Sequence, residues 1–254
     1  MKTMKLTTAA LALLGAVSFS TLAHATAAAT LILGIYDTNN TGLPSFEASL
    51  GTVASLTNGE TWALGSQALG VYSSDSSATL VFNIAATGGN SGNSANGLPG
   101  AKEIALTEPD GGTITPPNTG NSTLNTNINS LYNEYGAGTT TALAGGTGFT
   151  DLTVSNSQTG SFAKTVALSG GDYGLTSSGA NPSILANYTS GTIVDLDDFA
   201  SGATSTTEFG TFTVSSNGNL TYNTLVAAPE PSTYALMFGG LVALWAYKRR
   251  RSSV

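Results

Sequence analysis

The chain has 254 residues and a formal net charge of −7, but most of its basic residues lie at its two ends. Between residues 26 and 228, fourteen Asp and Glu face only two lysines, a balance of −12. Phosphate backbones repel such a body, so nucleic acid is not expected as a partner. Cysteine is absent, which excludes disulfides and thiolate chemistry.

The first 25 residues have the pattern of a secretory signal peptide. Lys2 and Lys5 precede an apolar run from Ala9 to Val17, and Ala23 and Ala25 form a small-x-small cleavage pattern. The apolar run is well short of the roughly 20 residues that a membrane-spanning helix needs. We therefore expect signal peptidase to cleave after Ala25.

Residues 26–226 are predicted to form one all-β ectodomain, an antiparallel β-sandwich of the jelly-roll type. Short apolar and β-branched runs are separated by Gly, Asn, Ser and Pro, as in sandwiches and barrels. The predicted strands are, in chain order, Thr30 to Tyr36, Thr79 to Ala85, Thr150 to Val154, Phe162 to Leu168 and Thr192 to Leu196.

The region between the second and third of these strands is predicted to be loop and then helix. Residues 86–120 are rich in glycine and contain four prolines, which indicates one or two long exposed loops. After a capping-type Asn121 or Ser122, an apolar pattern with helical spacing predicts one short amphipathic helix. Its apolar members are Leu124, Ile128, Leu131, Tyr132 and Tyr135.

The last predicted hairpin has the clearest strand signal in the chain. Phe212 and Val214 alternate with polar residues, and the alternation resumes at Leu220 and Tyr222. Asn217-Gly218 between them predicts a two-residue turn. The hairpin therefore places the C-terminal tail directly after a terminal strand.

Residues 227–254 form a tail with three ordered parts. Pro229, Glu230 and Pro231 precede an apolar run from Tyr234 to Tyr247, and the basic residues that follow are Lys248, Arg249, Arg250 and Arg251. A helix over the apolar run would be about 21 Å long, which spans a hydrocarbon core of about 30 Å only marginally. The positive-inside rule keeps the basic end in the cytoplasm and the body outside.

This tail resembles the PEP-CTERM sorting signal of Gram-negative bacteria. The resemblance implies that an exosortase, a membrane protease of the transpeptidase type, recognises Pro229, Glu230 and Pro231 and removes the helix and the basic end. It also implies export across the inner membrane, a transient anchor there through the C-terminal helix, and a final place at the cell surface or in the extracellular matrix. Members of this family resemble biofilm, floc or exopolysaccharide components that are often regarded as glycoproteins. A permanent single-pass anchor is the alternative interpretation.

Few catalytic arrangements are open to the body. The only histidine, His24, lies in the predicted signal peptide, so triads that need His or Cys and zinc sites lose their usual residues. No P-loop or dinucleotide motif is present, and the run Gly145-Gly146-Thr147-Gly148 is interpreted as a turn. We therefore expect no cofactor and no enzymatic activity.

Asp195, Asp197 and Asp198 are the densest acidic group. Alternation along a strand would place Asp195 and Asp197 on one face, and oxygen ligands suit calcium. The spacing is not that of an EF-hand loop. A solvated strand end is the favoured interpretation, and a weak calcium site is the alternative.

Three functions stay open at this point. The leading hypothesis is a noncatalytic structural or adhesive protein of the cell surface or exopolysaccharide matrix, which works by display and association. The second is a carbohydrate-binding module whose exposed aromatic side chains would stack on sugars, although core packing is the favoured interpretation of each aromatic residue. Its candidates are Trp62, Tyr72, Tyr132, Tyr135, Tyr173 and Tyr188. The third is a carboxylate-dependent glycosidase or lyase, although the sequence singles out no acidic pair.

Overall fold

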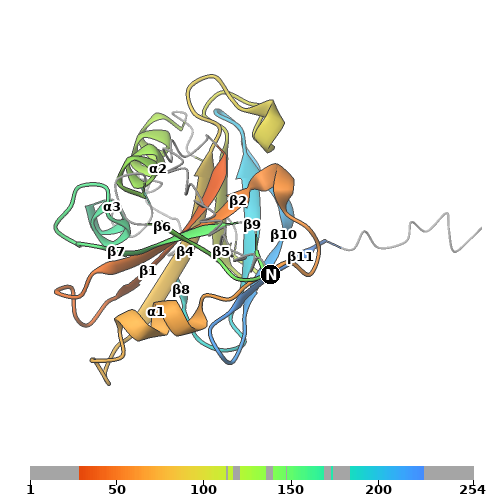
Figure 1. Cartoon of the computed structure of the whole chain (residues 1–254). Coiled ribbons are helices and arrows are strands. Elements are labelled where there is room, and N and C mark those ends of the chain that lie inside the picture. The colour runs from red at the N-terminus through yellow and green to blue at the C-terminus, as the bar shows by residue number, and fades with distance from the viewer. Residues whose placement is uncertain are drawn as a thin grey trace, which may run out of the picture.

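The computed structural model describes residues 29–112, 114–116, 121–135, 140–146, 148–168, 173 and 184–225 (Figure 1). The predicted signal peptide, with Ala23 and Ala25, and the predicted tail lie outside these residues. The strands are β1 (Thr30–Asp37), β2 (Ser45–Thr52), β3 (Thr61–Trp62), β4 (Leu80–Thr87), β5 (Ile104–Pro109), β6 (Thr140–Ala142), β7 (Phe149–Val154), β8 (Ala186–Asn187), β9 (Ile193–Phe199), β10 (Thr207–Val214) and β11 (Leu220–Thr224). The helices are α1 (Gly65–Val71), α2 (Ser122–Tyr135) and α3 (Phe162–Leu168), with short 3-10 turns at Val53–Ser55 and Ser94–Asn96.

The strands of the described region form one antiparallel sheet, which confirms the predicted all-β antiparallel class. Its order is β3-β11-β10-β9-β5-β4-β1-β2-β7-β6, with β8 pairing on β4. One hydrogen-bonded path replaces the two separate sheets of a strict sandwich, and it curves into a half-barrel. The curvature brings strands from distant parts of the path onto one shared core, where Leu50 of β2 and Phe212 of β10 both lie.

Two hydrophobic cores lie on opposite faces of this sheet, and β1 contributes to both. Leu31, Leu33 and Ile35 point into the larger core, together with side chains of β2, β10, β11 and α1. Ile32 points into the smaller core, which contains residues of α2 and α3. Because successive strand residues face opposite sides, a strand that is covered on both faces is apolar throughout.

Helix α2 confirms the predicted amphipathic helix. The five residues that were predicted to form its apolar face are buried in the smaller core. The carbonyl of Asn121 accepts the first helical hydrogen bond, from the Asn125 N–H at 2.8 Å. Of the two predicted candidates, Asn121 is therefore the N-cap residue.

The prediction of a strand at Phe162–Leu168 was wrong, because this segment is helix α3. Side chains of β2 hold the first turn of the helix: the Phe162 N–H donates to Glu47 Oε1 at 2.7 Å, and the Ala163 N–H donates to Ser45 Oγ at 3.1 Å. Ser161 precedes the helix, and its carbonyl accepts from the Thr165 N–H at 2.8 Å. Helix N-terminal N–H groups need such partners, and this tertiary cap outweighs the strand propensity of Phe, Thr and Val.

The prediction that residues 86–120 are exposed loop was also wrong in part. Strand β5 lies inside this region and pairs with β4 and β9 in the middle of the sheet. Five of its six residues are buried, because cores cover both faces of the sheet. The short apolar run of β5 ends in Glu108 and Pro109 and lies within a stretch rich in Gly and Pro, which favoured the loop interpretation. Strand β2 and helix α1 were missed as well.

The terminal hairpin is confirmed, with a different turn. Val214 pairs with Leu220, and the Gly218 N–H donates to the Ser215 carbonyl at 3.0 Å. Gly218 has a φ of 75°, so residues 216–218 form a three-residue loop that closes on a left-handed glycine. The Gly59 N–H donates to the Tyr222 carbonyl at 2.8 Å, so the segment that leads into β3 covers the outer edge of β11.

Candidate functional site

The six aromatic candidates for sugar stacking are all core residues, as the favoured interpretation of each expected. Their side chains are between 0% and 5% exposed. Several of the tyrosine hydroxyl groups donate hydrogen bonds to backbone carbonyls. Tyr132 donates to the Thr30 carbonyl at 2.8 Å, and Tyr135 donates to the Phe149 carbonyl at 2.6 Å. Burial raises the pKa of each of the five tyrosines, so their hydroxyls stay protonated. None of the six can stack on a sugar.

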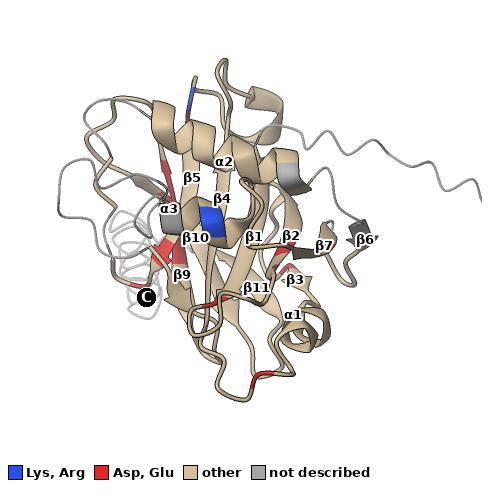
Figure 2. Ribbon diagram, turned by 90° about the vertical axis from the view of Figure 1, so that its left-hand side faces the viewer, with Lys and Arg blue, Asp and Glu red and all other residues tan. Residues whose placement is uncertain are grey.

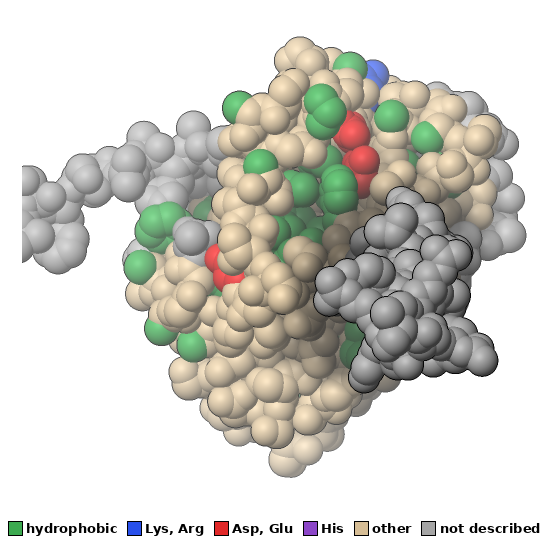
Figure 3. All heavy atoms as spheres, turned by 90° about the vertical axis from the view of Figure 1, so that its right-hand side faces the viewer, with side chains coloured by type: hydrophobic (Ala, Val, Ile, Leu, Met, Phe, Trp, Pro, Cys, Tyr) green, Lys and Arg blue, Asp and Glu red, His purple; other side chains and the backbone are tan. Residues whose placement is uncertain are grey.

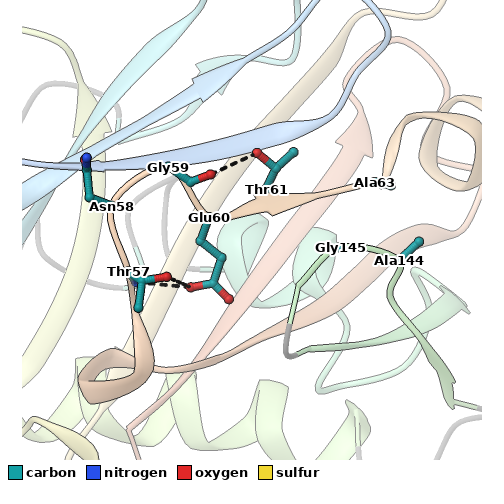
Figure 4. A pocket seen from close by; sticks show the side chains of 8 residues that line it. All are labelled: Thr57, Asn58, Gly59, Glu60, Thr61, Ala63, Ala144 and Gly145. Carbon is teal, nitrogen blue, oxygen red and sulfur yellow. Dashed lines mark hydrogen bonds between the residues drawn. The ribbon is translucent and has the colours of Figure 1, made fainter.

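A hollow of the described surface lies beside β3 (Figure 4) and has a volume of about 630 Å³. Glu60 is fixed at its edge, because Glu60 Oε2 accepts from the Thr57 N–H at 3.1 Å and from its hydroxyl at 3.4 Å. Glu60 is the only carboxylate of this lining. A hollow with one carboxylate lacks the acid and base pair that glycoside hydrolysis uses. The lining residues are Thr57, Asn58, Gly59, Glu60, Thr61, Ala63, Ala144 and Gly145.

The glycine-rich run beside this hollow has a packing role. A Cβ atom added to Gly146 would lie 2.2 Å from Cδ1 of Trp62, whose indole is fully buried. Gly145 adopts a φ of 89°, which L side chains rarely adopt. The described part of the run is thus a bend that lies over Trp62, in agreement with the prediction of a turn.

The three aspartates predicted as a solvated strand end lie in β9, within the sheet between β5 and β10. That interpretation was wrong, since Asp197 is only 5% exposed. Asp195 and Asp197 share one face, as predicted, but Asp198 is next to Asp197 in an unbroken strand register and faces the other side. In the part of the chain that the structure describes, no group of three or more acidic side chains is arranged to hold a metal ion.

Buried Asp197 and partly buried Asp198 each meet a glutamate from the neighbouring strand region instead. Asp197 and Glu108 form a side-chain hydrogen bond on the face of the smaller core, and burial followed by this contact raises the pKa of Glu108 to about 8. Asp198 meets Glu103, and burial followed by the charge of Glu103 raises the pKa of Asp198 to about 7. The sequence offered one signal for these contacts: an acidic residue, Glu108, inside the apolar run of β5.

The surface of the body carries little charge. Figure 2 shows few basic residues on the ribbon, and acidic residues on β5 and β9. In the view of Figure 3, most of the described surface is backbone or neutral polar side chain, with acidic atoms in a few places. The exposed residues between 73 and 79 are typical, because all of them are Ser or Thr.

The body ends close to the predicted tail. Strand β11 ends at Thr224, and residues 227–251 match a protein family described as the PEP-CTERM protein-sorting motif. The chain carries a PEP-CTERM sorting motif. This motif implies export, anchoring of the C-terminus in the membrane, and processing by an exosortase-type membrane protein.

The PEP-CTERM match covers the predicted recognition residues Pro229, Glu230 and Pro231 and the basic residues Lys248, Arg249, Arg250 and Arg251. All of these lie outside the described residues. Within the described residues, no helix is both long and apolar enough to cross a membrane. No curated protein and no solved structure matches this chain.

Proposed function

We propose that this exported protein is a noncatalytic structural or adhesive component of the cell surface or of an exopolysaccharide matrix, delivered there by exosortase processing. The observation that carries the proposal is the PEP-CTERM motif at 227–251, which begins three residues after the last strand of a folded β body. Such an arrangement presents the whole body outside the membrane while the tail is processed.

The surface chemistry of the body supports a role in association rather than catalysis. Its exposed loops are rich in hydroxyl and amide groups, which bind neutral polysaccharides through many weak hydrogen bonds. The described hollow beside β3 offers one carboxylate, and the buried acidic pairs touch one another, whereas glycosidase carboxyl groups stand about 5–9.5 Å apart. These features favour display and association over the glycosidase or lyase alternative.

The sorting step is tested by the intact mass of the protein recovered from its native surface. The wild type should begin near Thr26, end near the motif and lack Arg249–Arg251. Replacement of Pro229, Glu230 and Pro231 by alanine should leave the basic end in place. The matched control replaces Ser232 and Thr233 by alanine and should be processed normally. An intact C-terminus in every form would contradict exosortase sorting.

The matrix role is tested separately, by the amount of exopolysaccharide that stays with cells after shear. Cells without this protein should retain less polysaccharide, and the wild-type gene should restore retention. The alanine variant of residues 229–231 should not restore it, because its body stays at the membrane. Equal retention in all strains would contradict the structural role while leaving sorting intact.

A further inference from the structure

Two contacts between carboxyl groups bind β5 to β9, one on each face of the sheet. Glu108 meets Asp197, and Glu103, the residue before β5, meets Asp198. The register pairs Leu106 with Asp197 and Ala105 with Asp198, and these two β5 residues belong to different cores. Glu108, Asp197 and Glu103 are between 3% and 8% exposed. The two contacts therefore link β5 and β9 on opposite faces of the sheet.

No basic side chain of the body can neutralise these carboxyl groups. Residues 26–228 contain only two lysines and no arginine or histidine. The amine of Lys102 donates to Ser122 Oγ at 2.8 Å, and that of Lys164 donates to the Ser157 carbonyl at 3.1 Å. Buried carboxylates without a cation are costly, so another species must remove their charge.

The neighbouring titratable groups add negative charge. The charged groups that act on Glu108, Asp195 and Glu208 from β5, β9, β10 and the turn after β5 are all acidic: Asp110, Asp195 and Asp197. The charges of Glu103 and Asp197 act on Asp198 in the same way. Each further ionisation in this part of the sheet is therefore opposed.

The hydrogen bonding of these carboxyl groups also requires a proton. Glu108 Oε2 and Asp198 Oδ1 are buried and receive no hydrogen bond from an N–H or O–H donor of the described residues. Two ionised carboxylates are acceptors only, so they cannot bond to one another. A contact between two carboxyl groups becomes a hydrogen bond when one of them is protonated.

We propose that each of the two carboxyl contacts holds one proton in the folded body, and that loss of these protons at rising pH loosens β5, β9 and β10. Strand β10 pairs with β11, the strand that leads to the sorting tail. The device therefore couples the acidity of the medium to the part of the sheet from which the tail departs.

The sign of the pH dependence follows from the pKa values. Glu108 and Asp198 have ordinary pKa values of 4.5 and 3.8, and the folded body raises them to about 8 and about 7. Between these limits the folded state holds protons that the unfolded chain has released. The unfolding equilibrium constant should therefore rise with pH, by up to about tenfold per pH unit for each group. The gain in stability is complete below about pH 4 and is lost as the pH rises through about 7 to 8.

The experiment uses the full chain in detergent micelles with Trp245→Phe, so that Trp62 is the only tryptophan. Trp62 is fully buried, with its ring 5.9 Å from that of Phe212 in β10, and its fluorescence reports on this part of the sheet. The urea midpoint should fall steadily from pH 5 to pH 8. The double variant Glu108→Gln, Asp198→Asn should lose most of this fall. Glu60→Gln, which also removes an acidic group, should keep it.

Infrared spectroscopy of the wild-type chain keeps the proposal testable if the double variant fails to fold. A protonated-carboxyl band should be present in the folded chain at pH 6 and should disappear when urea unfolds it at the same pH. A urea midpoint that is flat or rises between pH 5 and pH 8 would overturn the proposal. Absence of the protonated-carboxyl band in the folded chain at pH 6 would overturn it too.

Discussion

Gly34 of β1 lies directly beneath the ring of Phe162 in α3. A Cβ atom added to Gly34 would stand 2.1 Å from Cγ of Phe162, far inside van der Waals contact. The ring also meets Tyr36 edge-on, with the ring centroids 5.8 Å apart. The absence of a side chain at one strand position thus allows α3 to settle on the sheet.

Replacing Gly34 by alanine should therefore destabilise the body by about 1–3 kcal/mol, because the root of the Phe162 ring must move. Urea unfolding, followed by Trp62 fluorescence, measures the loss. The double variant Gly34→Ala, Phe162→Ala should lose less stability than the two single variants lose together, because removing the ring also removes the clash. Gly70→Ala is the matched control: Gly70 lies in α1 with open space around it, and this change should be neutral or slightly stabilising. Equal losses for both glycine variants would contradict this packing argument.

Removal of the hydroxyl group at Ser45 should loosen α3. Ser45 Oγ accepts from the Ala163 N–H at 3.1 Å and donates to Asn156 Oδ1 at 2.7 Å. Ser45→Ala should cost about 1–2 kcal/mol, as the loss of a helix cap does. Hydrogen exchange should accelerate in α3 more than in α2. Ser76→Ala, at an exposed loop position, is the control, and a comparable acceleration in that variant would argue against a capping role.

The hydroxyl group of Tyr72 joins three backbone groups, one in β1, one in β2 and one in the residue before β2. Its single proton lies between the carbonyls of Ile35 at 2.7 Å and Pro44 at 3.1 Å, and its oxygen accepts from the Phe46 N–H at 3.1 Å. Tyr72→Phe leaves these buried groups without their partner, so we expect a loss of about 1–3 kcal/mol. Tyr222→Phe loses one bond, to the Phe209 carbonyl, and should cost less. A thermal unfolding series compares the two, and a larger loss for Tyr222→Phe would refute the expectation.

Replacing Gly146 by alanine should disturb Trp62. The added Cβ would approach Cδ1 and Nε1 of the indole to 2.2 and 2.3 Å, so either the bend or the ring must shift. We expect a red-shifted Trp62 emission in the folded chain and a loss of about 1–3 kcal/mol in stability. Gly191→Ala separates this clash from backbone strain, because Gly191 has open space but a φ of 84°. It should lower the stability without moving the emission.

The sequence by itself determined the features that depend on neighbouring residues. The PEP-CTERM tail is a linear motif that a processing enzyme meets as a stretch of chain, and its match confirms the prediction. The cleavage site at Ala23 and Ala25 stays a prediction. Helix α2 and the terminal hairpin were predicted because their apolar periodicity is local, and each residue of that pattern is buried as expected.

Only the tertiary structure decided the rest, because the deciding partners are far apart in the chain. Phe162–Leu168 has a strand-like composition, yet it is helical because Glu47 and Ser45 cap it from more than a hundred residues away. Strand β5 is buried on both faces, so no alternation marks it. The acidic contacts of Glu108 with Asp197 and of Glu103 with Asp198 depend on the register of two strands, and local propensity carries no information about which strands become neighbours.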